Sequence, residues 1–162
     1  MQFGRSHIYS RANKRLFVIR NLRQFPIPMK ELVTLYGQFI RSLLEFNSNV
    51  WFSSWTEEES EDLERVQKTV CKILLKEKYT TYQQALADLD IEDLKTRRLK
   101  IAIKFGKGCQ NIDKMKHLFS KQDDQNYNLR NQDEINVQFA SKQRLYKSTI
   151  PTLQRLLNTS KT

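Results

Sequence analysis

Glycine, proline and cysteine are scarce in this sequence. Its 162 residues include 4 Gly, 3 Pro and 2 Cys, against 39% hydrophobic and 28% charged residues. This balance excludes collagen-like and linker-like chains and favours a helix-rich fold over a β-sandwich. The length suffices for one domain with a real core, or for two small helical lobes, but not for a large multidomain enzyme. We therefore predict a mainly α protein, built as a small helical bundle.

Long apolar runs are also absent. The longest mostly apolar stretch, residues 32–46, is interrupted by polar and charged side chains at Thr34, Gln38, Arg41 and Glu45. A membrane-spanning helix needs about 20 consecutive apolar residues. The first residues include Arg5 and Arg11 but no apolar signal-peptide core. We therefore expect an intracellular protein with no membrane partner.

Histidine and cysteine are too few and too scattered for a zinc site. Cys71, Cys109, His7 and His117 show no short ligand spacing such as CxxC. Isolated cysteines inside helical patterns are typical of buried, reduced thiols. The acidic residues between positions 57 and 64 fit the start of a helix, and no histidine lies near them for acid–base catalysis. We therefore expect no metal, no cofactor and no catalytic residue.

Acidic residues are missing from the first 30 positions, which hold five Arg and two Lys. The whole chain has a formal net charge of +10. A surplus of Lys and Arg favours polyanionic partners through phosphate contacts and counterion release. Charge alone does not choose between RNA, DNA and anionic lipid.

Apolar residues recur at helical spacing along most of the chain. In residues 8–22 they define one helix face, so the opposite face should expose Arg11, Lys14 and Arg15. Thr56 and the three glutamates after it form the pattern of a capping box at the start of another helix. The same reasoning predicts further helices over residues 28–44, 57–77, 82–89, 94–105, 112–119 and 151–157.

The segments between these helices predict the domain organisation. We interpret Gly106 and Gly108 as the end of the helix over residues 94–105, and residues 50–55 as an apolar, extended linker. Ile135, Val137 and Phe139 alternate as in a strand, and residues 145–150 are a candidate partner for a short β-hairpin near the C-terminus. The expected parts are a helical domain (1–119), a polar loop (120–134) and a C-terminal strand and helix segment (135–162).

Short sequence blocks along the chain occur in a recognisable order. They read RANKRL (11–16), LEF (44–46) with VW (50–51), LERVQK (63–68), Tyr82 with AL (85–86), Leu94 with RR (97–98), KF (104–105), STIP (148–151) and LLN (156–158). In this order the chain resembles the region downstream of the catalytic palm in jockey-like non-LTR retrotransposon reverse transcriptases. The resemblance implies thumb helices that grip a template–product duplex, followed by a segment of poorly defined role.

The palm itself has no counterpart in this sequence. A reverse transcriptase holds two divalent metals between palm aspartates, usually in an aromatic-x-Asp-Asp turn. The one Asp pair here, Asp123 and Asp124, follows Lys121 and Gln122 in a polar stretch without that aromatic residue. The resemblance therefore implies a non-catalytic C-terminal fragment, whose palm belongs to another or a longer chain.

The basic residues supply the candidate nucleic-acid-binding site. They would contact phosphates of RNA or DNA, in a duplex or hybrid, without reading sequence. They are Arg11, Lys14, Arg15, Arg20 and Arg23, with Arg97, Arg98 and Lys104 in support. Two alternatives are a helical protein-interaction scaffold, which would use an exposed apolar face, and a degenerate remnant of a mobile element.

Overall fold

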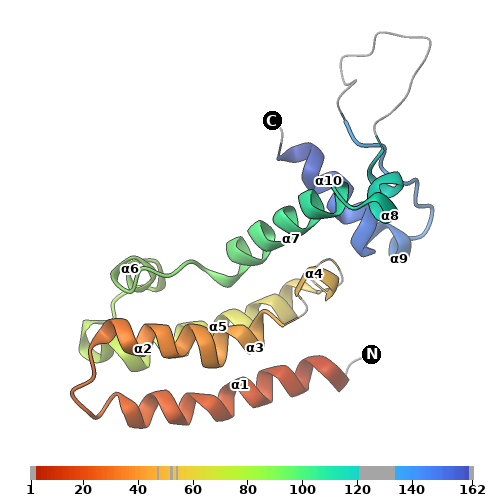
Figure 1. Cartoon of the computed structure of the whole chain (residues 1–162). Coiled ribbons are helices and arrows are strands. Elements are labelled where there is room, and N and C mark those ends of the chain that lie inside the picture. Colours follow the sequence, from red (N-terminus) through yellow and green to blue (C-terminus); the bar gives the residue numbers. More distant parts are fainter. Residues whose placement is uncertain (1–2, 47, 52, 54, 121–133, 161–162) are drawn as a thin grey trace, which may run out of the picture. The chain divides into compact units, whose positions relative to one another are not determined.

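The computed structural model describes residues 3–46, 48–51, 53, 55–120 and 134–160. Within these ranges the chain is mainly α-helical and forms no strand, which confirms the predicted fold class (Figure 1). The chain divides into two compact units, of which the first joins residues 1–47 to 55–97 and the second joins residues 48–54 to 98–162. This boundary differs from the one expected after residue 119, because the helix that begins at Leu94 contributes its first turn to one unit and the rest to the other.

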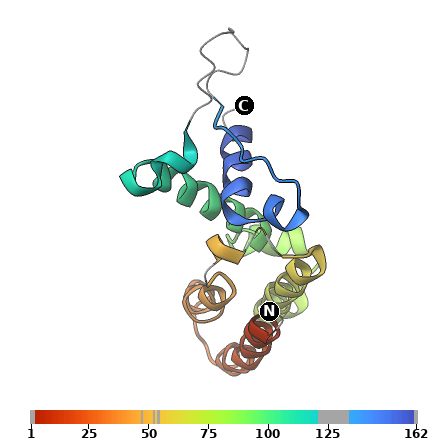
Figure 2. The same ribbon diagram turned by 90° about the vertical axis from the view of Figure 1, so that its right-hand side faces the viewer.

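The first unit is a bundle of three long helical segments. α1 (Phe3–Leu22) is followed by α2 (Met29–Tyr36), a π-helical turn (Gly37–Arg41) and α3 (Ser42–Leu44), and then by α5 (Glu57–Leu75). Figures 1 and 2 show these three segments side by side in both views. α6 (Tyr82–Asp88) and the first turn of α7 (Leu94–Gln110) complete the unit.

The core of the first unit takes one apolar face from each of these segments. Its buried side chains include Ala12, Leu16 and Ile19 from α1, Leu32, Tyr36, Ile40 and Leu44 from the second segment, and Leu63, Val66, Val70 and Leu74 from α5. Burying a large aliphatic side chain stabilises a fold by about 1.5–3 kcal/mol. These contacts fix which face of α1 remains open to solvent.

A π-helical turn adjusts the register of the second segment. Its buried residues Leu32, Tyr36, Ile40 and Leu44 are spaced four apart, whereas an α-helix repeats every 3.6 residues. In a continuous α-helix this spacing would turn the later side chains progressively away from the core. The wider turn at Gly37–Arg41 offsets that rotation and keeps all four residues buried.

Side-chain caps mark where three helices begin. The Glu59 amide donates to the Thr56 hydroxyl at 3.2 Å and the Thr56 amide donates to the Glu59 carboxylate at 2.9 Å, which confirms the predicted capping box of α5. The Thr81 hydroxyl accepts an amide of the first turn of α6 at 3.3 Å. At the start of α7 the Asp93 carboxylate accepts the Thr96 amide at 2.8 Å.

The second unit packs short helices around the latter part of α7. These are α4 (Ser48–Trp51), α8 (Asp113–Lys116) with a 3-10 turn (His117–Phe119), α9 (Gln143–Tyr146) and α10 (Thr149–Thr159). Its buried core consists of Ala102, Cys109, Phe119, Ile135, Leu153 and Leu157. None of the helices that the structure describes is both long and apolar enough to cross a membrane.

The interpretation of Gly106 and Gly108 as a helix end was wrong. α7 continues through both glycines to Gln110. At Gly106 a Cβ atom would lie 3.2 Å from Cδ1 of Leu157 in α10, whereas at Gly108 it would meet no atom within 4 Å. The glycine at position 106 therefore serves a close helix–helix approach, which sequence spacing alone does not distinguish from a helix end.

The expected β-hairpin near the C-terminus was also wrong. Residues 143–146 and 149–150 lie in α9 and α10, so they are not available as a strand. The backbone near Ile135 pairs with side-chain amides instead. The Ile135 amide donates to Asn158 Oδ1 at 2.8 Å and Asn158 Nδ2 donates to the Ile135 carbonyl at 3.0 Å. One turn earlier on α10, Gln154 accepts the Gln138 amide at 3.0 Å and donates to the Leu118 carbonyl at 2.6 Å.

The expected extended linker over residues 50–55 begins instead as a helical turn. α4 includes Val50, whose carbonyl accepts the Thr149 hydroxyl of α10 at 3.0 Å. The last carbonyls of a helix have no partner within the helix, and this bond supplies one for α4. Most of the expected polar loop, including Asp123 and Asp124, lies outside the described residues.

Candidate nucleic-acid interface

The outer face of α1 carries a row of exposed cations with an aromatic residue among them. Arg11, Lys14 and Arg20 are exposed, and Phe17, which lies between the last two in sequence, is 65% exposed. Positions three residues apart on a helix are neighbours on its surface. Each step of three residues turns by about 60° around the helix axis, so these four exposed positions wind across the side of α1 that the core leaves open, with Lys14 and Phe17 in the middle and Arg11 and Arg20 at its two edges.

Two other predicted cations on this helix and just beyond it are engaged by the protein. The Arg15 guanidinium donates to the Phe39 carbonyl and lies 4.5 Å from the centroid of the Phe39 ring. Arg23 Nε donates to the Leu74 carbonyl at 2.8 Å, at the end of α5, where unpaired carbonyls attract a cation. Both residues hold α1 to its neighbours, and neither is fully exposed.

The three predicted cations of α7 differ in their surroundings. In the first unit, Arg97 forms an ion pair with Glu45, which lies just after α3. In the second unit, Arg98 is buried at 5% exposure, whereas Lys104 is exposed. The structure therefore leaves Arg11, Lys14 and Arg20 exposed along α1 and does not expose Arg97 and Arg98 in the same way.

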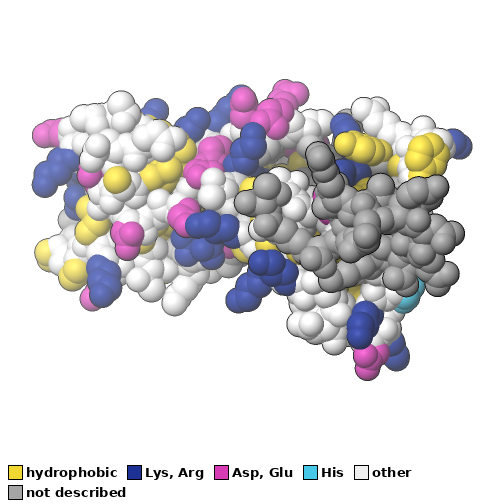
Figure 3. All heavy atoms as spheres, turned by 90° about the horizontal axis from the view of Figure 1, so that it is seen from above, with side chains coloured by type: hydrophobic (Ala, Val, Ile, Leu, Met, Phe, Trp, Pro, Cys, Tyr) yellow, Lys and Arg dark blue, Asp and Glu magenta, His cyan; other side chains and the backbone are white. Residues whose placement is uncertain are grey.

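Acidic residues on the first unit are concentrated at the start of α5. Arg65 pairs there with Asp62 at 2.5 Å, and Lys95 pairs with Glu57 at 2.5 Å. Such exposed pairs contribute little to stability. On the face shown in Figure 3, acidic side chains lie among Lys and Arg side chains. Among the described residues no group of three or more His, Cys, Asp or Glu side chains could hold a metal ion.

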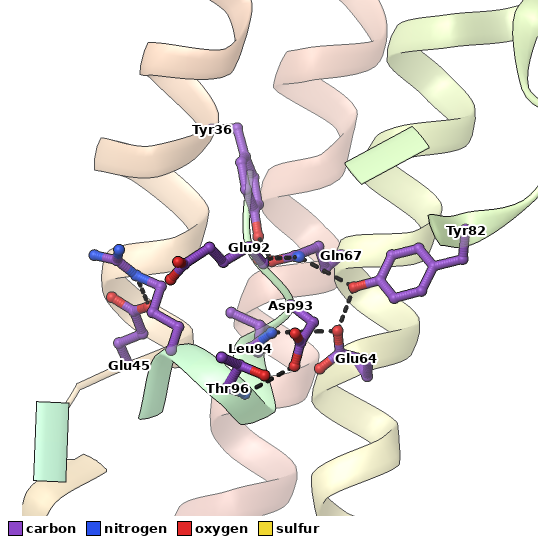
Figure 4. A network of polar contacts seen from close by, with 10 residues as sticks. Tyr36, Glu45, Glu64, Gln67, Tyr82, Glu92, Asp93, Leu94 and Thr96 are labelled. Carbon is purple, nitrogen blue, oxygen red and sulfur yellow. Dashed lines mark hydrogen bonds and ion pairs between the residues drawn. The ribbon is translucent and has the colours of Figure 1, made fainter. Parts of the chain in front are cut away.

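A buried polar network joins α2, α5 and α6 in the first unit (Figure 4). Gln67 of α5 is fully buried, and its side chain accepts the Tyr36 hydroxyl at 2.5 Å. It donates to the Tyr82 hydroxyl at 3.0 Å and to the Glu92 carbonyl at 2.8 Å. The Glu64 carboxylate in turn accepts the Tyr82 hydroxyl. The side chain of Gln67 thus connects its own helix, α5, to α2 and α6.

The side chains that form the network are neutral except for the Glu64 carboxylate, which accepts the Tyr82 hydroxyl. Burial raises the pKa of Tyr36 and of Tyr82 above the ordinary value of 10, and the bond to Glu64 raises that of Tyr82 further. Glu64 also accepts the Leu94 amide at 3.3 Å, at the first residue of α7. Burial raises the pKa of nearby Cys71 to about 11, so its thiolate is disfavoured at neutral pH. These groups fit a structural role, because they connect the end of α2 and the starts of α6 and α7 to α5.

The second unit carries cations that the sequence analysis left out of the candidate site. Of the chain's 28 Lys and Arg and 18 Asp and Glu, the second unit holds 13 and 5 respectively, and hence most of the net charge of +10. Lys142, Arg144 and Lys147 are all exposed at α9 and its two ends. The signal was present in the sequence, since residues 135–162 contain no acid at all.

Comparisons with protein-family models, with curated proteins and with solved structures find no match for this chain. The exposed cations of α1 and the surfaces around them are therefore the features that bear on the function of this chain.

Proposed function

We propose that this chain is a non-catalytic C-terminal fragment, thumb and post-thumb, of a retrotransposon RNA-directed DNA polymerase. In this proposal the outer face of α1 binds the backbone of a template–product duplex. The observation that carries the proposal is the exposure of Arg11, Lys14 and Arg20 across the open side of a helix whose other side packs in the core. The sequence blocks that resemble jockey-like reverse transcriptases motivate the choice of a polymerase.

The dimensions of α1 suit a contact with several phosphates. A helix of 20 residues is about 30 Å long, and the three cations span about half of it. Contacts of Lys and Arg with phosphates position a protein on a duplex but carry no sequence information. The exposed ring of Phe17 adds an apolar contact within the same row, of the kind that packs on sugars or base edges.

The proposal assigns no chemical step to this chain. Polymerisation would need palm aspartates that hold two metal ions, and in the proposal these belong to another or a longer chain. The role left to the fragment is to hold the duplex, which requires charge and shape but no reactive group. Its binding should therefore be strongly dependent on salt.

The test is binding to a short fluorescent RNA–DNA hybrid, followed by anisotropy across a salt series. We expect the triple variant R11Q, K14Q and R20Q to lower the slope of log K against log salt by about 2 to 3, because each lost phosphate contact removes about 0.9. Arg15 stays unchanged because it also holds α1 in place.

A matched control carries the same charge change on exposed lysines elsewhere in the first unit, at Lys30, Lys72 and Lys78. Its slope should stay close to that of the wild type. Equal losses in both triple variants would contradict a site on α1 and leave only a general effect of net charge. If the wild type does not bind the hybrid even at low salt, the alternative of a protein-interaction scaffold or an inactive remnant is favoured.

A further inference from the structure

A second surface, on the second unit, combines exposed aromatic rings with cations. It consists of Phe139, Lys142, Arg144, Tyr146 and Lys147, and we name it the α9 surface. Phe139 is 87% exposed and Tyr146 is 51% exposed. The three cations are exposed as well. All five residues lie within nine positions of one another, on α9 or directly beside it.

The Tyr146 ring is held in place rather than left mobile. The guanidinium of Arg155 from α10 stacks on this ring, 3.8 Å from its centroid. The same guanidinium donates to the Tyr146 carbonyl at 2.5 Å and to the Thr152 hydroxyl at 3.1 Å. One side of the ring is thus covered by a fixed cation while half of the side chain stays in contact with solvent. A ring held in this way loses little conformational entropy when a flat ligand stacks on it.

The backbone before Phe139 is also fixed. The Gln138 amide donates to the Gln154 side chain, and the Ile135 backbone is bound on both its amide and its carbonyl by Asn158. The chain therefore holds the most exposed Phe ring of the described residues next to an anchored backbone. Burying such a ring inside the unit would gain free energy, so its exposure is consistent with use on a partner.

The charge around this surface selects an anionic partner. Residues 135–160 contain Lys142, Arg144, Lys147 and Arg155 and no acid. In the described part of the second unit, the acidic residues are Asp113 and Glu134, both outside the α9 surface. Cations beside exposed, fixed aromatic rings are the combination with which proteins bind single-stranded nucleic acid, because bases stack on rings while the phosphates meet the cations.

From these observations we infer that the α9 surface binds single-stranded RNA or DNA, with bases stacked on Tyr146 and Phe139 and phosphates at Lys142, Arg144 and Lys147. This site differs from the duplex-binding row on α1 both in its residues and in the form of nucleic acid that it takes. It extends the proposed function, but its occupation does not require α1 to bind a duplex.

The test measures binding of a fluorescent oligo(dT) of about 15 nucleotides, a length in the range that single-strand-binding folds cover. We expect F139A combined with Y146A to weaken this binding about tenfold or more, since stacked bases lose their platform. Y146F keeps the ring and should bind like the wild type. The triple variant K142Q, R144Q and K147Q should lower the salt slope by about 2.

Matched controls come from the first unit. Phe25 and Phe46 are exposed to 60% and 61%, and F25A combined with F46A should leave binding of oligo(dT) unchanged. The α1 variant R11Q, K14Q and R20Q should lose the hybrid but keep oligo(dT), so the two proposals can fail separately. Circular dichroism verifies that each variant keeps its helices.

Three results would overturn the inference. The first is tight binding of oligo(dT) by F139A with Y146A, and the second is an equal loss in the F25A and F46A control. The third is binding to phosphatidylserine vesicles that depends on the same rings, in the absence of oligo(dT) binding. That last result would assign the α9 surface to an anionic lipid surface instead.

Discussion

Replacing the fully buried Gln67 by methionine tests the polar network that joins α2, α5 and α6. Methionine has nearly the same size, so the packing changes little, but it can neither accept the Tyr36 hydroxyl nor donate to Tyr82 and Glu92. A buried hydroxyl that loses its partner costs about 1–3 kcal/mol, and lost neutral hydrogen bonds about 1 kcal/mol each. Burial of the apolar thioether recovers roughly 1 kcal/mol. We therefore expect Q67M to lower the free energy of unfolding by about 2–4 kcal/mol.

The assay is urea and thermal unfolding of the full chain, followed by circular dichroism and by tryptophan fluorescence, since Trp55 packs against the core of the first unit. For a unit of this size, even a loss of about 2 kcal/mol corresponds to a fall in Tm of about 10 °C. The matched control is Q83M, the same replacement at an exposed position of α6, which should change the stability by less than about 0.5 kcal/mol.

A double-mutant cycle with Y36F isolates the central bond. Once the Tyr36 hydroxyl is removed, Q67M no longer strands it, so the double variant should recover about 1 kcal/mol relative to the sum of the single changes. A coupling energy near zero, or an equal loss in Q67M and Q83M, would refute the reasoning. Either result would mean that Gln67 is buried without holding Tyr36 in place.

Three further predictions concern backbone crowding, a helix cap and a thiol. G108A should raise the free energy of unfolding by about 0.5–1 kcal/mol because alanine favours a helix. The G106A variant should be about 1 kcal/mol less stable than the G108A variant, because its methyl group crowds Leu157 of α10. Thermal unfolding of both variants measures the difference. Burial alone would raise the pKa of Asp93, but hydrogen bonds to its carboxylate lower the pKa below 3.8. D93A should therefore lower the free energy of unfolding by about 1 kcal/mol at pH 7 and by progressively less as the pH falls below 3.8. Urea unfolding at pH 7 and pH 3 measures this loss, and a loss independent of pH would contradict the prediction. Cys71 is fully buried and its pKa is raised to about 11, so a thiol reagent at pH 8 should modify it only as the protein unfolds; rapid modification of the folded chain would contradict that expectation.

Much of the helical architecture could be predicted from the sequence because local signals agreed there. The apolar face of α1, the capping box at Thr56 and the proline after position 25 that follows α1 all act within a few residues. The glycine at position 106 was misinterpreted because its reason is a contact with Leu157, 51 positions away. The π-helical turn was not predicted, although the strict four-residue spacing from Leu32 to Leu44 is its signal.

The candidate site could be predicted only in part. Charge and helical spacing predicted Arg11, Lys14 and Arg15 to face solvent, and the structure exposes Arg11 and Lys14, whereas Arg15 is partly buried. Spacing could not show that Arg15 and Arg23 donate to carbonyls far away in the sequence, one in the π-helical turn and the other near the end of α5. The α9 surface was overlooked because an expected β-hairpin would have placed Tyr146 in a strand.

The pairing of Asn158 with both backbone groups of Ile135 has a consequence for sequence variation. In a β-ladder, contacts between the two strands set their register, so a substitution on one strand can be compensated by a substitution on the other. Here the segment after Ile135 is aligned by two side-chain amides of α10, those of Asn158 and Gln154. The exposed side chains of Asn136 and Gln138 are thus free to diversify, whereas an aspartate at position 158 would lose the donor to the Ile135 carbonyl and weaken the attachment of this backbone to α10.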